Sequence, residues 1–162
     1  MTDQRTIGRM KDGLLNFFSP MMCLSCGTEG DFLCLSRGHS LTTVGPQYCQ
    51  QCGVPLNEGK LCSACTGEKF HIDGFRSVCL HQSLARKIVY ALKYENKKAL
   101  AQPMAVLMAS FLAANPLLFD VLLPVPLHHK KLRPRGYNQA GLLAKELSRL
   151  IGIPLAEGLL IR

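Results

Sequence analysis

Cysteines in Cys-x-x-Cys spacing are the residues of this sequence whose chemistry is most sharply defined. Cys49 and Cys52 form one pair, Cys62 and Cys65 form another, and nine residues separate the two pairs. Each pair places two sulfur atoms on one tight turn, and two such turns complete a tetrahedron around one zinc ion. Gly53, directly after the first pair, permits the positive φ that the turn requires. Because four thiolates leave no coordination position open, the predicted role of the metal is structural.

A weaker copy of this pattern lies upstream, at Cys23, Cys26 and Cys34. A complete ribbon would have its fourth ligand at position 37, where the sequence has Arg37 instead. His39 is an alternative donor, since imidazole is a good zinc ligand, but its spacing is off the pattern. Two hypotheses therefore stay open: a zinc site with an unusual fourth ligand, or a degenerate ribbon that binds metal weakly or not at all.

Eight cysteines in 162 residues also raise the question of disulfides. The N-terminal segment has no continuous hydrophobic region, so it is not a signal peptide. Metal binding is therefore favoured over disulfides, and the predicted location is the cytoplasm. Cys79 has no partner pair, and we expect it to be a small core residue in a strand over residues 72–80.

A second stretch with chemical character follows a short apolar run at residues 121–125. The run predicts a strand buried on both faces, as in a parallel sheet. Pro126 ends this strand, because proline cannot donate to a sheet ladder. Six of the eight residues 128–135 are basic, and we expect them to form a loop. Asn138 is a candidate N-cap for the amphipathic helix that follows over residues 140–151.

A basic loop between a buried strand and a helix N-terminus is a typical phosphate site, because ligands of α/β sheets bind there and helix N-termini attract anions. Arg133 and Arg135 can each grip a phosphate through two hydrogen bonds, and Gly136 lets the backbone approach closely. His128 either contacts the anion or only closes the loop through a hydrogen bond. Composition alone is equally compatible with a solvated basic loop.

The residues PVPLH (124–128), Arg133 and RGYNQ (135–139) resemble the signature of the ComF family of phosphoribosyltransferase-like proteins. The resemblance implies that this segment is a pyrophosphate-binding loop. The anion-binding residues that it implies are His128, Arg133, Arg135, Gly136, Tyr137, Asn138 and Gln139. It also implies two zinc ribbons, phosphoribosyl pyrophosphate or another phosphate ligand, and a link to DNA uptake in natural competence.

The family also carries a second signature, an acidic pair followed by a Thr/Gly-rich loop that holds the 5-phosphate and ribose. Nothing in this sequence matches that signature. We therefore expect this chain alone to lack transferase activity, and Mg²⁺ to bind with phosphoribosyl pyrophosphate only if a C-terminal part is present. The sheet is expected to be incomplete, and the chain to be an N-terminal fragment or a truncated product.

The expected fold class is α/β, with N-terminal zinc ribbons followed by an incomplete phosphoribosyltransferase-type parallel sheet and flanking helices. The expected domains are an amphipathic helix over 1–22, a double zinc ribbon over 23–70 and a phosphoribosyltransferase-like part over 71–162. Apolar spacing predicts helices over 84–92 and 103–114. Lys93 faces the active site if the family resemblance holds, or is a solvated helix-end lysine. The uncharged stretch 99–119 is broken by polar residues and prolines, so no membrane span is predicted.

Two classes of function are compatible with these patterns. The first is an enzyme-like phosphoribosyltransferase domain joined to zinc ribbons, with structural zinc as its metal. The second is a non-catalytic zinc-ribbon module that binds single-stranded DNA, competence proteins or another partner. The net charge of +8 suits anionic partners in either case. Aromatic residues make up only 7% of the chain and tryptophan is absent, which argues against a stacking platform for single strands.

Overall fold

The computed structural model describes residues 22–34, 41–42, 44–45 and 47–161. The chain divides into two compact units, Met1–His39 and Ser40–Arg162, which are described separately below. The predicted helix over 1–22 lies outside the described residues, apart from residue 22. Arg37 and His39, the two positions discussed as the end of the first ribbon, lie outside them as well.

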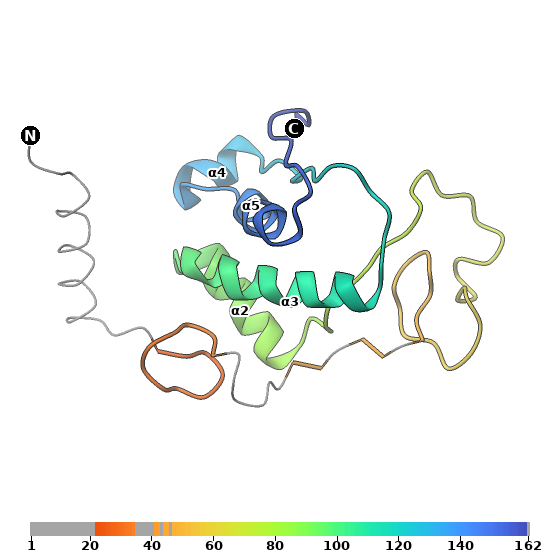
Figure 1. Cartoon of the computed structure of the whole chain (residues 1–162), viewed down its shortest axis with the longest axis horizontal. Helices are drawn as coiled ribbons and strands as arrows, with labels where there is room; N and C mark the ends of the chain where they lie inside the picture. The colour runs from red at the N-terminus through yellow and green to blue at the C-terminus, as the bar shows by residue number, and fades with distance from the viewer. Residues whose placement is uncertain (1–21, 35–40, 43, 46, 162) are drawn as a thin grey trace, which may run out of the picture. The chain divides into compact units, whose positions relative to one another are not determined.

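Helices supply the regular structure of the second unit (Figure 1). They are α2 (Ser83–Tyr94), the 3-10 helix η1 (Lys98–Leu100), α3 (Ala101–Ala114), α4 (His129–Arg135) and α5 (Gln139–Ile151). The helices predicted over 84–92, 103–114 and 140–151 are therefore confirmed as α2, α3 and α5. The helix α4 and the 3-10 helix η1 have no counterpart among the sequence-based expectations.

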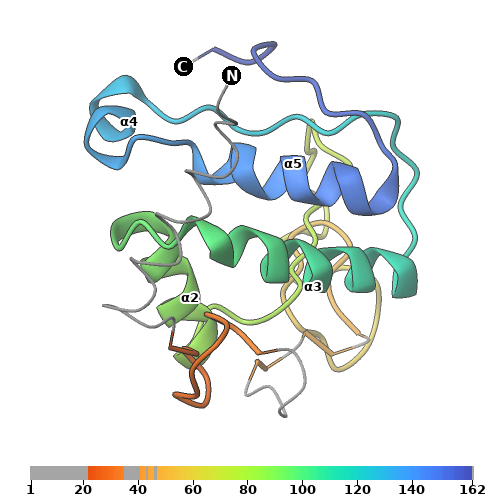
Figure 2. The ribbon, with the colours of Figure 1, turned by 60° about the vertical axis from the view of Figure 1, so that its left-hand side comes forward.

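The core of this unit lies where α2, η1 and α3 meet. Leu84, Ile88 and Leu92 recur every four residues along α2, so they share one face, and all three are buried. Leu100 and Ala105 have no exposed surface at all. Small residues on α3 let another helix approach closely, and α3 packs along α5 (Figure 2). This packing fixes where α5 begins, and with it one end of the candidate anion site.

The predicted incomplete parallel sheet is wrong, because the described part of the chain contains no β-strand. Isolated bridges occur in place of strands, and the parallel one joins Leu122 to Leu155. The Leu122 N–H donates to the Pro154 carbonyl at 2.9 Å, and the Ala156 N–H donates to the Leu122 carbonyl at 3.0 Å. Pro124 has no N–H group with which to continue the ladder.

The same segment is not buried on both faces, as its apolar run had predicted. Val121, Leu123 and Val125 are exposed by 40%, 42% and 63%. Their alternation with less exposed neighbours is that of an extended segment with one face toward the protein. The predicted strand over 72–80 is also absent, since these residues form bends and irregular backbone with a single bridge position at Cys79.

The predicted basic loop is a short helix, α4. The His128 imidazole caps it, with Nδ1 accepting a hydrogen bond from the Lys130 N–H at 3.3 Å. Gly136 ends it in the left-handed conformation, at φ 74°. Lysine, leucine and arginine are good helix formers, so a cap at each end is enough to wind these residues into a helix. The prediction gave too much weight to charge and too little to helix propensity.

The uncharged stretch over residues 99–119 contains α3, which has 14 residues. A helix needs about 20 consecutive apolar residues to span a bilayer. Among the residues that the structure describes, no helix is both long and apolar enough to do so.

Candidate functional site

Four cysteine sulfurs of the second unit form what we call the second cysteine cluster: Cys49, Cys52, Cys62 and Cys65. All four sulfur atoms lie within 4.8 Å of one another, and those of Cys52 and Cys62 are 3.7 Å apart. A tetrahedral zinc ion with Zn–S bonds of about 2.3 Å places its sulfurs about 3.8 Å apart. The cluster therefore has the dimensions of a four-thiolate zinc site.

Local backbone geometry positions these sulfurs. The Gly53 N–H donates to the Cys49 carbonyl at 2.8 Å, and the Thr66 N–H donates to the Cys62 carbonyl at 3.0 Å. Each bond closes a tight turn around one Cys-x-x-Cys pair. Gly53 has φ 74°, as the spacing predicted, so the first turn relies on a residue that tolerates this conformation.

Hydrogen bonds to sulfur favour the thiolate form that zinc requires. Burial alone would raise the pKa of the Cys49 thiol, but backbone N–H groups of Cys52, Cys62 and Gln51 lower it to about 6. The Cys62 N–H lies 3.4 Å from the Cys49 sulfur. Burial and the three neighbouring thiols instead raise the pKa of Cys65 to about 12. Several thiolates this close repel one another, and a divalent cation between them removes that repulsion.

A segment after the second cluster returns over its first turn. The Phe75 N–H donates to the Gln51 carbonyl at 2.8 Å, and the Arg76 guanidinium donates to the Gln50 carbonyl at 2.7 Å. Gly74, at φ 150°, lies so close that an added Cβ would be 2.2 Å from the Gln50 carbonyl oxygen. Sequence analysis did not single out Gly74, because its neighbour in space lies more than twenty residues away.

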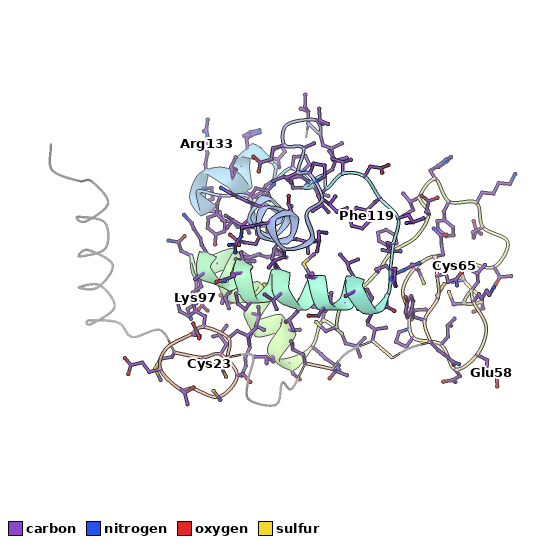
Figure 3. The ribbon with its side chains drawn as sticks, in the orientation of Figure 1. Cys23, Glu58, Cys65, Lys97, Phe119 and Arg133 are labelled. Atoms are coloured by element: carbon purple, nitrogen blue, oxygen red, sulfur yellow. The ribbon has the colours of Figure 1, made fainter. Side chains whose placement is uncertain are left out.

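The first cysteine cluster, in the first unit, consists of Cys23, Cys26 and Cys34. The Cys34 sulfur lies 3.5 Å from that of Cys23 and 3.3 Å from that of Cys26. The Cys34 N–H also points at the Cys23 sulfur at 3.4 Å, as the Cys62 N–H does at Cys49 in the second cluster. Figure 3 labels Cys23 here and Cys65 in the second cluster. Three sulfurs in this arrangement fit three ligands of a zinc site.

The second unit also contains a pocket of about 680 Å³, which we call the basic pocket. One wall comes from the end of α2 and the turn before α3, and the other from α4 and the residues after it. Its lining residues are Lys93, Tyr94, Asn96, Lys98, Lys130, Lys131, Arg133, Pro134, Arg135, Gly136 and Tyr137. Six of these are lysine or arginine and none is acidic, so the pocket is suited to an anion.

Aromatic side chains hold two of the cations in place. The Arg135 guanidinium carbon lies 5.3 Å from the centre of the Tyr94 ring, and its Nη1 donates to Oε1 of Gln139. The Lys98 ammonium lies 4.8 Å from the centre of the Tyr137 ring. Such cation–π contacts are attractive and restrict the motion of flexible side chains. The pocket is therefore partly organised before any ligand arrives.

Tyr137 joins the two walls. Its ring is 8% exposed, and its hydroxyl donates a hydrogen bond to the carbonyl of Leu92 near the end of α2. Burial raises the pKa of this phenol, against the lowering effect of the nearby Arg135 charge. Tyr137 therefore remains a neutral donor near pH 7, and its role is to position the walls.

The structure separates the seven anion-site residues that the sequence suggested into two groups. Arg133, Arg135, Gly136 and Tyr137 line the basic pocket, whereas His128, Asn138 and Gln139 do not. His128 caps α4, and Gln139 accepts from Arg135. Asn138 caps α5 through the Ala140 N–H, as predicted, and donates to the Val125 carbonyl at 3.0 Å. These three residues make hydrogen bonds next to the pocket but do not line it.

Sequence analysis missed the second wall of the pocket, formed by Tyr94, Asn96 and Lys98. It had left open whether Lys93 is solvated or faces a site, and the structure places it in the pocket lining. The one available signal was the Leu92-Lys93-Tyr94 triplet, which resembles the family pattern. Charge alone could not distinguish Lys93 and Lys98 from other surface lysines.

Comparison with known proteins agrees with this arrangement of cysteines. The double zinc ribbon domain matches residues 14–66, a range that includes both cysteine clusters. Competence protein F of Haemophilus influenzae is 29% identical over 115 residues, which cover 66% of this chain and 49% of that protein. Both similarities support a ComF-family protein. The two cysteine clusters of this chain are compatible with structural zinc. No solved structure matches it significantly.

The chain spans about half the length of the curated relative that it matches. The match to the double zinc ribbon domain concerns the cysteine region alone. What the basic pocket binds therefore has to be argued from its own chemistry.

We expect Cys62→Ser to lower the zinc content by about one ion per chain, because a structural site rarely survives the loss of a thiolate ligand. Metal binding supplies most of the folding free energy of such a module, so the region around Cys49 should also become sensitive to protease. Elemental analysis after dialysis measures the zinc. Cys79→Ser, which changes a cysteine outside both clusters, is the control. Equal zinc content in Cys62→Ser and the wild type would contradict the assignment.

We expect Gly74→Ala to destabilise the second cluster by more than about 1 kcal/mol, because a Cβ would collide with the Gln50 carbonyl. Gly59→Ala is a matched control, since Gly59 also has a positive φ, of 85°, but its Cβ would meet open space. Competition with a zinc chelator would compare the two variants. If both released zinc equally easily, backbone strain and not the contact with Gln50 would explain the loss.

Proposed function

We propose that this chain is a ComF-family protein, that it binds a phosphorylated ligand in its basic pocket, and that zinc at the cysteine clusters has a structural role. The observation that carries the proposal is the gathering of six cationic side chains, with no carboxylate, around one pocket. Like charges held together repel, and a bound polyanion offsets that repulsion. Phosphoribosyl pyrophosphate and pyrophosphate both have the required chemistry.

The two arginines give the pocket its selectivity for phosphate. The planar guanidinium donates two parallel hydrogen bonds to phosphate oxygens, which an ammonium group does not do. Arg135 is held by Tyr94 and Gln139, so little of its conformational entropy is lost on binding. Arg133 projects from α4 (Figure 3) and is exposed, so it is available for an incoming anion. We assign anion recognition to these two residues together with Lys93 and Lys98.

A cellular role follows as part of the proposal. Competence protein F is named for natural competence, and we propose a related role in DNA uptake for this chain. Thiolate clusters that hold zinc are stable where thiols stay reduced, so we propose the cytoplasm as its compartment. In the same proposal, residues 23–70 form the ribbon region and residues 71–162 carry the phosphate-binding pocket.

A non-catalytic nucleic-acid-binding module is the second candidate function. The net charge of +8 favours it, because basic side chains bind a phosphate backbone independently of sequence. The basic pocket concentrates six cations in one place. A discrete pocket fits a small ligand better than an extended backbone does.

We expect Arg135→Ala to weaken pyrophosphate binding by about 1.5–3 kcal/mol, the range for a hydrogen bond to a charged group. Arg133→Ala should weaken binding in the same range, and it leaves the contacts of Tyr94 and Gln139 untouched. Arg149→Ala is the control, because Arg149 pairs with Glu146 at 2.8 Å and does not line the basic pocket. Calorimetric titration at fixed ionic strength measures all four proteins. Equal losses for Arg135 and Arg149 would indicate a diffuse basic surface and favour the nucleic-acid hypothesis.

A further inference from the structure

The basic pocket is larger than a bare phosphate ligand requires. Its volume is about 680 Å³. Pockets of about 300–1,000 Å³ enclose organic ligands of the size of a nucleotide. Inorganic pyrophosphate would leave most of this space to water, so the volume indicates a ligand with an organic part besides its phosphates.

The cations of the pocket are spread over both walls. Lys93 and Lys98 come from the α2–α3 side, and the arginines and two further lysines come from α4. A single phosphate carries about two negative charges, too few to compensate cations on both sides. A chain of two or three phosphates can contact both walls at once. The charge distribution therefore indicates a di- or triphosphate.

An exposed aromatic pair adjoins these cations. Tyr94, which lines the pocket, is 66% exposed, and Tyr90 one turn earlier is 55% exposed. Their ring centroids are 5.0 Å apart, and the rings are inclined at 45°. Aromatic rings so exposed contribute little to the core, whereas they offer a nucleobase a surface on which to stack. The Asn96 side chain, also in the lining, can donate to and accept from the edge of a base.

We propose that the basic pocket binds a nucleoside di- or triphosphate, with the base against Tyr94 and the phosphates among the cations of both walls. The Arg135 guanidinium lies over one part of the Tyr94 ring, so the base would stack on the ring surface that stays exposed, and a phosphate next to the sugar would reach the guanidinium. This inference rests on the proposed phosphate-binding function and names the class of its ligand.

A free nucleotide fits these observations better than a single strand of nucleic acid. Sequence-independent single-strand binding uses aromatic rings placed in succession along a basic groove. In the basic pocket, Tyr94 is the exposed aromatic residue, while Tyr137 is buried and bonded to Leu92. One stacking position combined with many cations suits one base with a phosphate chain.

The test compares adenosine diphosphate with pyrophosphate on the full chain, without added Mg²⁺. Calorimetric titration is performed on the wild type, Tyr94→Leu and Tyr94→Phe. Because stacking of one base on an aromatic ring is a substantial interaction, the wild type should bind the nucleotide at least about tenfold more tightly than pyrophosphate. Tyr94→Leu should weaken nucleotide binding more than pyrophosphate binding and so abolish this preference, because it removes the stacking surface as well as a contact of Arg135. Tyr94→Phe should retain the preference, with pyrophosphate affinity equal to that of the wild type. Zinc content is measured after each titration, because pyrophosphate itself binds metal ions.

Four results would overturn the inference, and each has a different consequence for the proposed phosphate-binding function. Equal affinity of the wild type for both ligands would leave a phosphate site without base recognition. If neither ligand bound, the proposed function would fail as well. Equal weakening of both ligands in Tyr94→Leu would show that the ring only holds Arg135. Tight competition by an oligothymidylate without a terminal phosphate would assign the tyrosine to single-stranded DNA.

Discussion

The hydrogen bond from the Tyr137 hydroxyl to the Leu92 carbonyl is the interaction on which the basic pocket depends. It joins residues 45 positions apart, and it does so inside the protein, where an unmade bond would cost about 1–3 kcal/mol. Leu92 immediately precedes the cationic wall that begins at Lys93, and Tyr137 follows α4 after a single residue, Gly136. Fixing this one distance therefore fixes the separation of two groups of like charges that would otherwise move apart.

The parts of the structure set by local sequence were predictable. Two Cys-x-x-Cys pairs bring their sulfurs together through tight turns, and the spacing of Leu84, Ile88 and Leu92 defines α2. That the apolar run would not form a sheet strand was not predictable from local sequence. An apolar run such as 121–125 needs partners on both sides to become a buried strand, and the described residues offer it one bridge, at Leu122. The apolar composition of a segment indicates that it can pack against other parts of the protein, but it does not show whether a neighbouring strand is present.

The candidate site likewise has one part that local sequence predicts and one part that it does not. Arg133, Arg135 and Gly136 were identifiable because they are close together in sequence, and Asn138 because an N-cap is a local feature. Lys98 and Asn96 lie some forty residues away from them, and the two segments are brought together by the packing of α3 against α5 and by the hydrogen bond from Tyr137 to Leu92. Local capping also replaced the predicted basic loop with α4, so its cations are presented from a helix. In this structure the pocket combines one wall that sequence suggests with one that only packing creates.

The central claim, that a phosphate ligand occupies one defined pocket, can be tested most directly by nuclear magnetic resonance. Titration of pyrophosphate into the isotope-labelled chain, followed through its backbone amide signals, locates binding residue by residue. The account predicts saturable shifts confined to residues 93–98 and 130–137, the two walls of the basic pocket. The amides around Cys49 and Cys62 should stay unchanged. Shifts spread over lysines across the surface, or concentrated in the cysteine region, would contradict it.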